Sequence, residues 1–78
     1  MSEKKKFFVH PSAFIEENVA IGKNTKIWRL VQVRTGAKIG QNCILGKSVF
    51  IDYEVSIGDN VKIQNLASVY HGVTIEDD

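Results

Sequence analysis

The sequence predicts an all-β fold, a single-stranded parallel β-helix of about four coils, and three observations support this prediction. Every sixth residue from position 9 to position 75 is Val, Ile or Leu, without an exception. A smaller or β-branched residue follows four positions after each of them, and Asn or Gly recurs at a fixed place in between. A six-residue period fits neither a helix nor a plain alternating strand, but it fits short strands joined by turns.

Two columns of inward-facing side chains are expected from this period. The aliphatic column is Val9, Ile15, Ile21, Ile27, Val33, Ile39, Leu45, Ile51, Ile57, Ile63, Val69 and Ile75. The smaller column is Ala13, Val19, Thr25, Val31, Ala37, Cys43, Val49, Val55, Val61, Ala67 and Val73. Asn and Gly tolerate positive φ, so tight corners can recur where they stand. Three corners close a coil of eighteen residues, and each residue stacks on the equivalent residue of the next coil.

The chain divides into a short lead and one repetitive domain. Residues 1–8 are expected to form a polar lead and cap, with Phe7 and Phe8 covering the open end of the first coil. Residues 9–78 are expected to form the β-helix, which runs without insertion and is truncated in its last hexad, at Asp78. A solenoid normally ends in a capping element. We therefore expect a fragment, or a second molecule that covers this end.

The length of 78 residues predicts self-association. A domain of this size buries only about 60–65% of its unfolded surface, so an added source of stability is expected. The single cysteine, Cys43, lies in the smaller inward column and cannot form a disulfide within the chain. Association of identical chains is the remaining source.

Composition restricts the partners and the compartment. A net charge of +1 argues against a nucleic-acid or anionic-membrane partner. The basic run Lys4–Lys6 is expected to be a solvated N-terminal tail rather than a membrane contact. No apolar segment reaches the length of a signal peptide or of a membrane span, so we expect no membrane insertion and a cytoplasmic protein.

Apolar side chains at outward positions predict a contact between chains. We expect a homotrimer in which three prisms pack against one another through these residues, and scattered surface apolar residues are the alternative. The residues concerned are Phe14, Trp28, Leu30, Phe50 and Leu66.

A few polar residues are candidates for chemistry. His71 is the candidate general base, because histidine titrates near neutral pH. Asn65 and its neighbour Gln64 could bond to a polar ligand. For all three residues a turn without chemical function is the alternative. A histidine-bound zinc site would need three ligands, and the chain has only His10 and His71, at opposite ends of the stack. No metal is therefore expected.

Arg34, Asp52 and Tyr70 share one outward column, because they are eighteen residues apart. This column could bind a charged sugar. It could equally be a ladder of ion pairs between coils, and the sequence leaves both interpretations open.

Five stretches of the chain match one known family: Phe8–Ala13, Lys26–Trp28, Gly36–Cys43, Val61–Asn65 and Val69–Asp78. They resemble one subgroup of the hexapeptide-repeat acyltransferases. Its members are N-acetyltransferases that act on nucleotide-linked amino sugars for surface polysaccharide, such as UDP-2-acetamido-3-amino-2,3-dideoxy-glucuronate. The resemblance implies a left-handed β-helix, acetyl-CoA as co-substrate, a nucleotide-sugar substrate and no metal.

The resemblance also implies how the candidate residues act. A sugar amine would attack the thioester in a cleft between neighbouring prisms, with His71, Asn65, Gln64 and Tyr70 lining its acceptor side. Members of the subgroup continue well beyond the point that corresponds to Asp78, so we expect this chain to be the N-terminal part of such an enzyme. The alternative is a self-associating β-helical module without catalysis.

Overall fold

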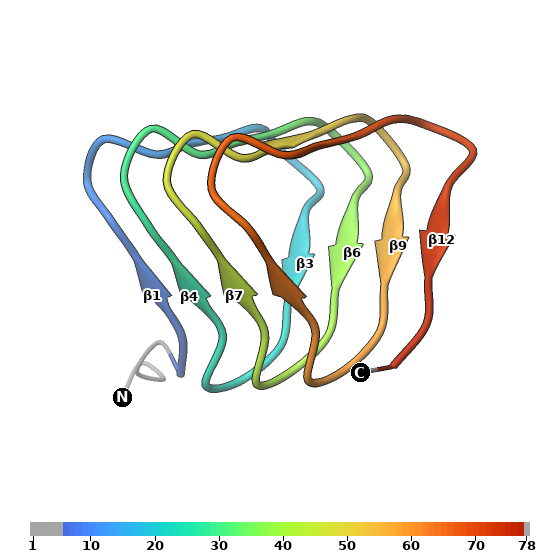
Figure 1. Cartoon of the computed structure of the whole chain (residues 1–78), viewed down its shortest axis with the longest axis horizontal. Helices are drawn as coiled ribbons and strands as arrows, with labels where there is room; N and C mark the ends of the chain where they lie inside the picture. The colour runs from blue at the N-terminus through green and yellow to red at the C-terminus, as the bar shows by residue number, and fades with distance from the viewer. Residues whose placement is uncertain (1–5, 78) are drawn as a thin grey trace.

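The computed structural model describes residues 6–77, which wind into stacked coils (Figure 1). Each strand in this part of the chain is two residues long and ends on one of the period-six aliphatic residues. The strands are β1 (Phe8–Val9), β2 (Phe14–Ile15), β3 (Ala20–Ile21), β4 (Lys26–Ile27), β5 (Gln32–Val33), β6 (Lys38–Ile39), β7 (Ile44–Leu45), β8 (Phe50–Ile51), β9 (Ser56–Ile57), β10 (Lys62–Ile63), β11 (Ser68–Val69) and β12 (Thr74–Ile75).

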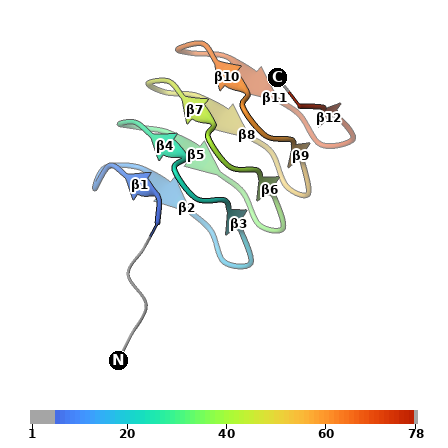
Figure 2. The same ribbon diagram turned by 90° about the horizontal axis from the view of Figure 1, so that it is seen from below.

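The strands form three parallel sheets, each with one strand from every coil (Figure 2). Sheet A has the order β1-β4-β7-β10, sheet B the order β11-β8-β5-β2, and sheet C the order β12-β9-β6-β3. The register places each residue beside the one eighteen positions away, as with Ile27 and Leu45. The predicted parallel β-helix of about four coils is therefore confirmed. Residues 6–77 include no helix with the length and apolar character needed to cross a membrane.

The core consists of the two predicted columns and is most completely closed in the middle coils. Ile27 and Leu45 are fully buried there, together with the free thiol of Cys43. Val9 and Ile75, in the outer coils, are only half-buried. Full burial of an aliphatic side chain contributes roughly 1.5–3 kcal/mol. The middle coils therefore supply most of the hydrophobic stabilisation.

The corners adopt the predicted left-handed backbone conformation. They do so even at positions where the residue is neither Asn nor Gly. It occurs at the expected positions Asn18, Asn24, Gly36, Asn42, Asn60 and Gly72, and also at Leu30, Ser48, Glu54 and Leu66. The two leucines have φ values of 60° and 70°. Such a conformation costs a residue with a side chain roughly 1–2 kcal/mol. The hydrogen bonds between coils must therefore hold these corners in place.

The first coil differs from the expected arrangement at Phe8. The sequence analysis predicts that Phe8 covers the open end, but this residue belongs to strand β1. Its ring lies 5.4 Å from the ring of Trp28, on the outer face of sheet A. Phe8 points outward because each strand begins one residue before the aliphatic position, and its role as a cap stays a prediction. Phe7 is half-buried, and residues 1–5 of the expected tail lie outside the described residues.

Gly40 shows how closely successive coils approach at the corner between sheets C and A. A Cβ atom at this position would lie 2.5 Å from the carbonyl oxygen of Gly58 in the next coil. Because that oxygen belongs to the backbone, it cannot move aside as the end of a flexible side chain could. The close approach therefore requires a glycine.

We expect Gly40→Ala to lower the free energy of unfolding by about 1–3 kcal/mol, the usual range for overpacking. Urea denaturation measures this loss. Lys38→Ala is the matched control, since Lys38 lies on the exposed side of strand β6, which ends just before Gly40, and it should change the free energy by less than about 0.5 kcal/mol. Equal stabilities of the two variants would show that the coils separate at this corner without cost.

Candidate functional site

The candidate residues lie on two different corners of the prism. The B–C corner joins sheets B and C and consists of residues 16–19, 34–37, 52–55 and 70–73. The A–B corner joins sheets A and B and consists of residues 10–13, 28–31, 46–49 and 64–67. The first corner holds Arg34, Asp52, Tyr70 and His71, and the second holds Gln64 and Asn65.

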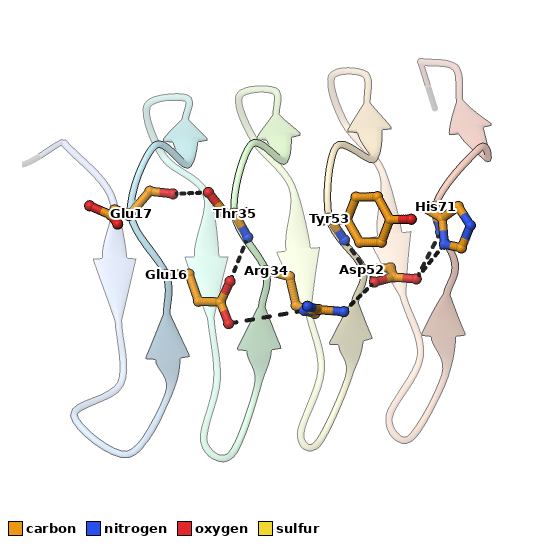
Figure 3. A network of polar contacts seen from close by, with 7 residues as sticks. All are labelled: Glu16, Glu17, Arg34, Thr35, Asp52, Tyr53 and His71. Carbon is orange, nitrogen blue, oxygen red and sulfur yellow. Dashed lines mark hydrogen bonds and ion pairs between the residues drawn. The ribbon is translucent and has the colours of Figure 1, made fainter.

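Asp52 is the centre of a polar network on the B–C corner (Figure 3). Its side chain is 7% exposed. One carboxylate oxygen, Oδ1, accepts hydrogen bonds from Arg34 Nη1 at 3.1 Å and from the Tyr53 amide at 2.9 Å. The other, Oδ2, accepts from the His71 amide at 3.1 Å and from His71 Nδ1 at 2.9 Å. Donors of the protein therefore occupy both oxygens of Asp52, for which the sequence analysis leaves substrate binding and an ion-pair ladder open.

His71 directs one ring nitrogen to Asp52 and keeps the other available. An ionised carboxylate only accepts hydrogen bonds, so Nδ1 donates to it, and in the neutral imidazole Nε2 then keeps its lone pair. The side chain is 57% exposed, and solvent therefore reaches the ring. A buried carboxylate that fixes the tautomer of an accessible imidazole is an arrangement suited to general-base chemistry.

The hydrogen bond from the His71 ring lowers the pKa of the Asp52 carboxyl from its usual 3.8 to about 2. Burial opposes this effect, while the amides of His71 and Tyr53 lower the pKa further. Asp52 is therefore ionised at neutral pH, as the tautomer of His71 requires.

Arg34 extends the network towards the N-terminal coils. Its Nε lies 4.0 Å from Glu16 Oε2, and Glu16 Oε1 accepts a hydrogen bond from the Thr35 amide at 2.9 Å. Of the two interpretations of this column, the structure shows the ladder of ion pairs for Arg34 and Asp52. Two carboxylates and one guanidinium leave one negative charge, which a proton on His71 would neutralise.

Tyr53 is a member of this cluster that the sequence analysis missed. Its ring stacks on the ring of His71, with centroids 4.6 Å apart and planes 15° from parallel. The guanidinium carbon of Arg34 lies 5.3 Å from the centroid of the same ring. The signal that could have identified Tyr53 is its spacing, since it precedes His71 by one full coil.

Tyr70 presents an aromatic surface beside the candidate base. Its ring lies 6.1 Å from the ring of Phe50, and the residue is 60% exposed. Most of the Tyr70 side chain is therefore open to solvent, and its role in substrate binding stays a prediction.

Gln64 and Asn65 lie on the A–B corner, and strand β11 separates them from His71. Asn65 Oδ1 accepts a hydrogen bond of 2.8 Å from the Lys47 amide in the preceding coil, a structural role. Within one chain the structure does not bring these two residues together with Tyr70 and His71. A cleft lined by all four residues would need two chains.

A shallow hollow of about 430 Å³ lies on the outer face of sheet C and extends onto the corner between sheets C and A. Its lining is Lys38, Ser56, Ile57, Gly58, Thr74, Ile75, Glu76 and Asp77. His71 lies on the other side of sheet C, on the corner that precedes strand β12 (Thr74–Ile75).

The histidine at the other end of the stack has a local role. His10 Nδ1 lies 2.9 Å from the hydroxyl of Ser12, which in turn accepts a hydrogen bond from the Leu30 amide. Across residues 6–77, no group of three or more His, Cys, Asp or Glu side chains is arranged to hold a metal ion.

Two family models match the chain. Residues 18–52 match the family described as bacterial transferase hexapeptide (six repeats), and residues 36–70 match the hexapeptide repeat of succinyl-transferase. The chain thus carries transferase-type hexapeptide repeats over most of its length.

Two relatives are longer than this chain. The dTDP-3-amino-3,6-dideoxy-alpha-D-galactopyranose 3-N-acetyltransferase of Aneurinibacillus thermoaerophilus is 45% identical over 42 residues, which are 54% of this chain and 21% of the relative. A solved structure of a mutant perosamine N-acetyltransferase from Caulobacter crescentus, in complex with CoA and GDP-perosamine, is 19% identical with a TM-score of 0.44. That match covers 90% of this chain and 50% of the other. This chain therefore spans about a fifth of the curated relative and half of the solved one.

Asp52 should make the stability of the chain depend on pH in acid. Its carboxyl titrates near 3.8 in the unfolded chain and near 2 in the folded one, so the unfolded chain takes up the proton first as the pH falls. The stability that this carboxylate contributes is fully present above pH 3.8 and is lost between pH 3.8 and about 2.

Urea denaturation at a series of acid pH values measures this dependence. Asp52→Asn should remove the dependence of the free energy of unfolding on pH that Asp52 causes between pH 3.8 and about 2. Asp59→Asn, on a different corner, leaves the network intact and is the control. An unchanged slope in Asp52→Asn would contradict the assignment of the lowered pKa to this carboxyl.

Proposed function

We propose that this chain, which carries transferase-type hexapeptide repeats, is part of an N-acetyltransferase that acts on the amino group of a nucleotide-linked amino sugar. The observation that carries the proposal is the pairing of exposed His71 with buried Asp52. The named activity of the 45%-identical relative supports the class of acceptor. Because the chain spans a fifth of that relative, the activity is proposed for the whole protein to which these coils belong.

The proposed reaction joins the amine nitrogen to the acetyl carbon and breaks the carbon–sulfur bond of acetyl-CoA. Nε2 of His71 accepts the proton that the amine loses, and the thiolate of coenzyme A leaves with the electron pair of the broken bond. The proton then passes from Nε2 to the thiolate, so that an amide and a free thiol are formed. Asp52 stabilises the imidazolium that exists in between.

Substrate positions follow from the two sides of the corner. We place the sugar against Tyr70, whose exposed ring can pack on the apolar face of a pyranose. The acyl donor would lie along the outer face of sheet C, which carries the hollow lined by Ser56 and Thr74. Holding both reactants beside His71 would supply much of the rate acceleration, because a correctly oriented pair reacts as if highly concentrated.

The finer identity of the reaction is also a proposal. We infer an acceptor of the 3-amino-uronic acid or amino-dideoxyhexose class, made for surface polysaccharide in the cytoplasm, where acetyl-CoA is available. One of the matching family models is described as a repeat of succinyl-transferase, so both acetyl and succinyl groups are to be tested as the acyl group.

We further propose that the prisms assemble as a homotrimer through the A–B corner. Leu30 and Leu66 project from this corner in the costly left-handed conformation, and they are 56% and 73% exposed. A polar residue would fit the same backbone at lower cost, so burial against a second copy is a sufficient reason for leucine here. This observation equally favours the alternative of a self-associating module without catalysis, and the activity of His71 variants separates the two.

His71→Gln should lower kcat by roughly 10²- to 10⁴-fold, the usual contribution of a general base. Steady-state rates with acetyl-CoA and succinyl-CoA, on nucleotide-linked amino sugars, measure the effect and identify the acyl group. His10→Gln is the matched control, since His10 is the other histidine of the chain, and this variant should retain the wild-type kcat. Full activity of His71→Gln would reject His71 as the base.

Leu30→Asn should weaken assembly while leaving the single chain at least as stable, because Asn adopts positive φ more readily than Leu. Loss of one buried leucine is worth roughly 1.5–3 kcal/mol, so the association constant should fall about 10- to 100-fold. Sedimentation velocity over a concentration series measures it. Ser48→Asn occupies the same corner position and is the control. Unchanged association of Leu30→Asn would place the interface elsewhere.

A further inference from the structure

We infer that Tyr53 is a positioning residue for His71: its ring fixes the plane of the imidazole so that Nε2 keeps one direction relative to the substrates. This inference rests on the proposed function of His71 as the base. Tyr53 occupies the same position of its coil as Glu17, Thr35 and His71 do in theirs.

The hydrogen bonds of His71 do not by themselves fix its ring. Both the backbone amide and Nδ1 of His71 bond to the same oxygen, Asp52 Oδ2. Two bonds that meet at one atom leave the imidazole free to tilt about the line from Nδ1 to that oxygen. Because more than half of the side chain is exposed, the rest of the chain does not confine the ring.

The stack on Tyr53 removes this freedom. The two rings are 15° from parallel with centroids 4.6 Å apart, so a tilt of the imidazole in one direction would drive it into the phenol ring. A tilt in the other direction would separate the two faces and expose them to water. The stacked geometry therefore selects one orientation of the ring plane.

Tyr53 is itself held on both sides. Its amide donates to Asp52 Oδ1, which ties its backbone to the carboxylate that positions His71. The guanidinium of Arg34, 5.3 Å from the ring centroid, packs on it from the preceding coil. Arg34 in turn donates a hydrogen bond to Asp52. His71, Asp52, Tyr53 and Arg34 are therefore linked in one continuous network of contacts.

The stack also suits the charge that His71 acquires during the reaction. A protonated imidazole over the face of an aromatic ring is stabilised by the negative face of that ring. The Asp52 carboxylate lies between the two cationic groups, Arg34 and protonated His71, and separates their charges. Tyr53 can therefore support the ring both before and after proton transfer.

The test compares Tyr53→Phe, which keeps the ring, with Tyr53→Leu, which removes it. NMR of the purified protein follows the ring protons of His71, which the face of Tyr53 should shift upfield, and the ¹⁵N signals that report its tautomer. His10 serves as the internal reference. The wild-type and Tyr53→Phe proteins should show the upfield shift and one tautomer. Tyr53→Leu should lose the shift and show a mixture of tautomers.

Kinetics supply the second readout. Tyr53→Leu should lower kcat roughly tenfold to a hundredfold with KM for the sugar unchanged, the scale of loss that a small misplacement of a reacting group causes. Tyr53→Phe should restore kcat. A merely structural role would instead change stability and both kinetic constants in the two variants alike.

Two results would overturn the inference. The first is the absence of the upfield shift of His71 in the wild-type protein, which requires no variant to fold. The second is a Tyr53→Leu protein with unaltered His71 signals and unaltered kcat. The proposed function is tested separately. Full activity of His71→Gln would reject it, whatever the NMR spectra of the Tyr53 variants show.

Discussion

The hydrogen bonds between successive coils are the constraint on which the whole structure depends. Each strand is two residues long, so a single coil could not keep its shape, and every coil is held by the next through bonds such as that from the Phe14 amide to the Val31 carbonyl, 2.8 Å. These bonds can repeat only when each coil has eighteen residues. As a result, Glu16, Arg34 and Asp52 stack in one column.

The fold was largely predictable because the same constraint is written in the sequence as a period. The aliphatic residues that end the strands, such as Ile27 and Leu45, were all identified by counting in sixes. The corners were predicted only where Asn or Gly marks them. Leu30 and Leu66 adopt the same conformation because their neighbours in adjacent coils impose it. Leucine has no intrinsic preference for positive φ, so the sequence does not predict this conformation.

The candidate site was predictable in its members but not in its contacts. The spacing of eighteen residues aligns Arg34 with Asp52 and Asp52 with Tyr70. The carboxylate nevertheless turns to His71, nineteen residues away, because the amide and the ring of that residue are both within reach. This choice depends on side-chain rotamers and on the competition between donors, which a period does not encode. The spacing of one coil places Tyr53 beside His71, but the stacking of the two rings again depends on their rotamers.

The fixed coil length also determines which insertions and deletions preserve the contact between Asp52 and His71. One codon inserted between Asp52 and His71 would turn every later residue towards a different face, and the imidazole would leave the carboxylate. Duplication or loss of eighteen codons beyond the pair would add or remove one whole coil and leave the pair intact. Lineages of such proteins can therefore lengthen or shorten in whole coils, whereas smaller insertions can persist only as loops that protrude from a corner.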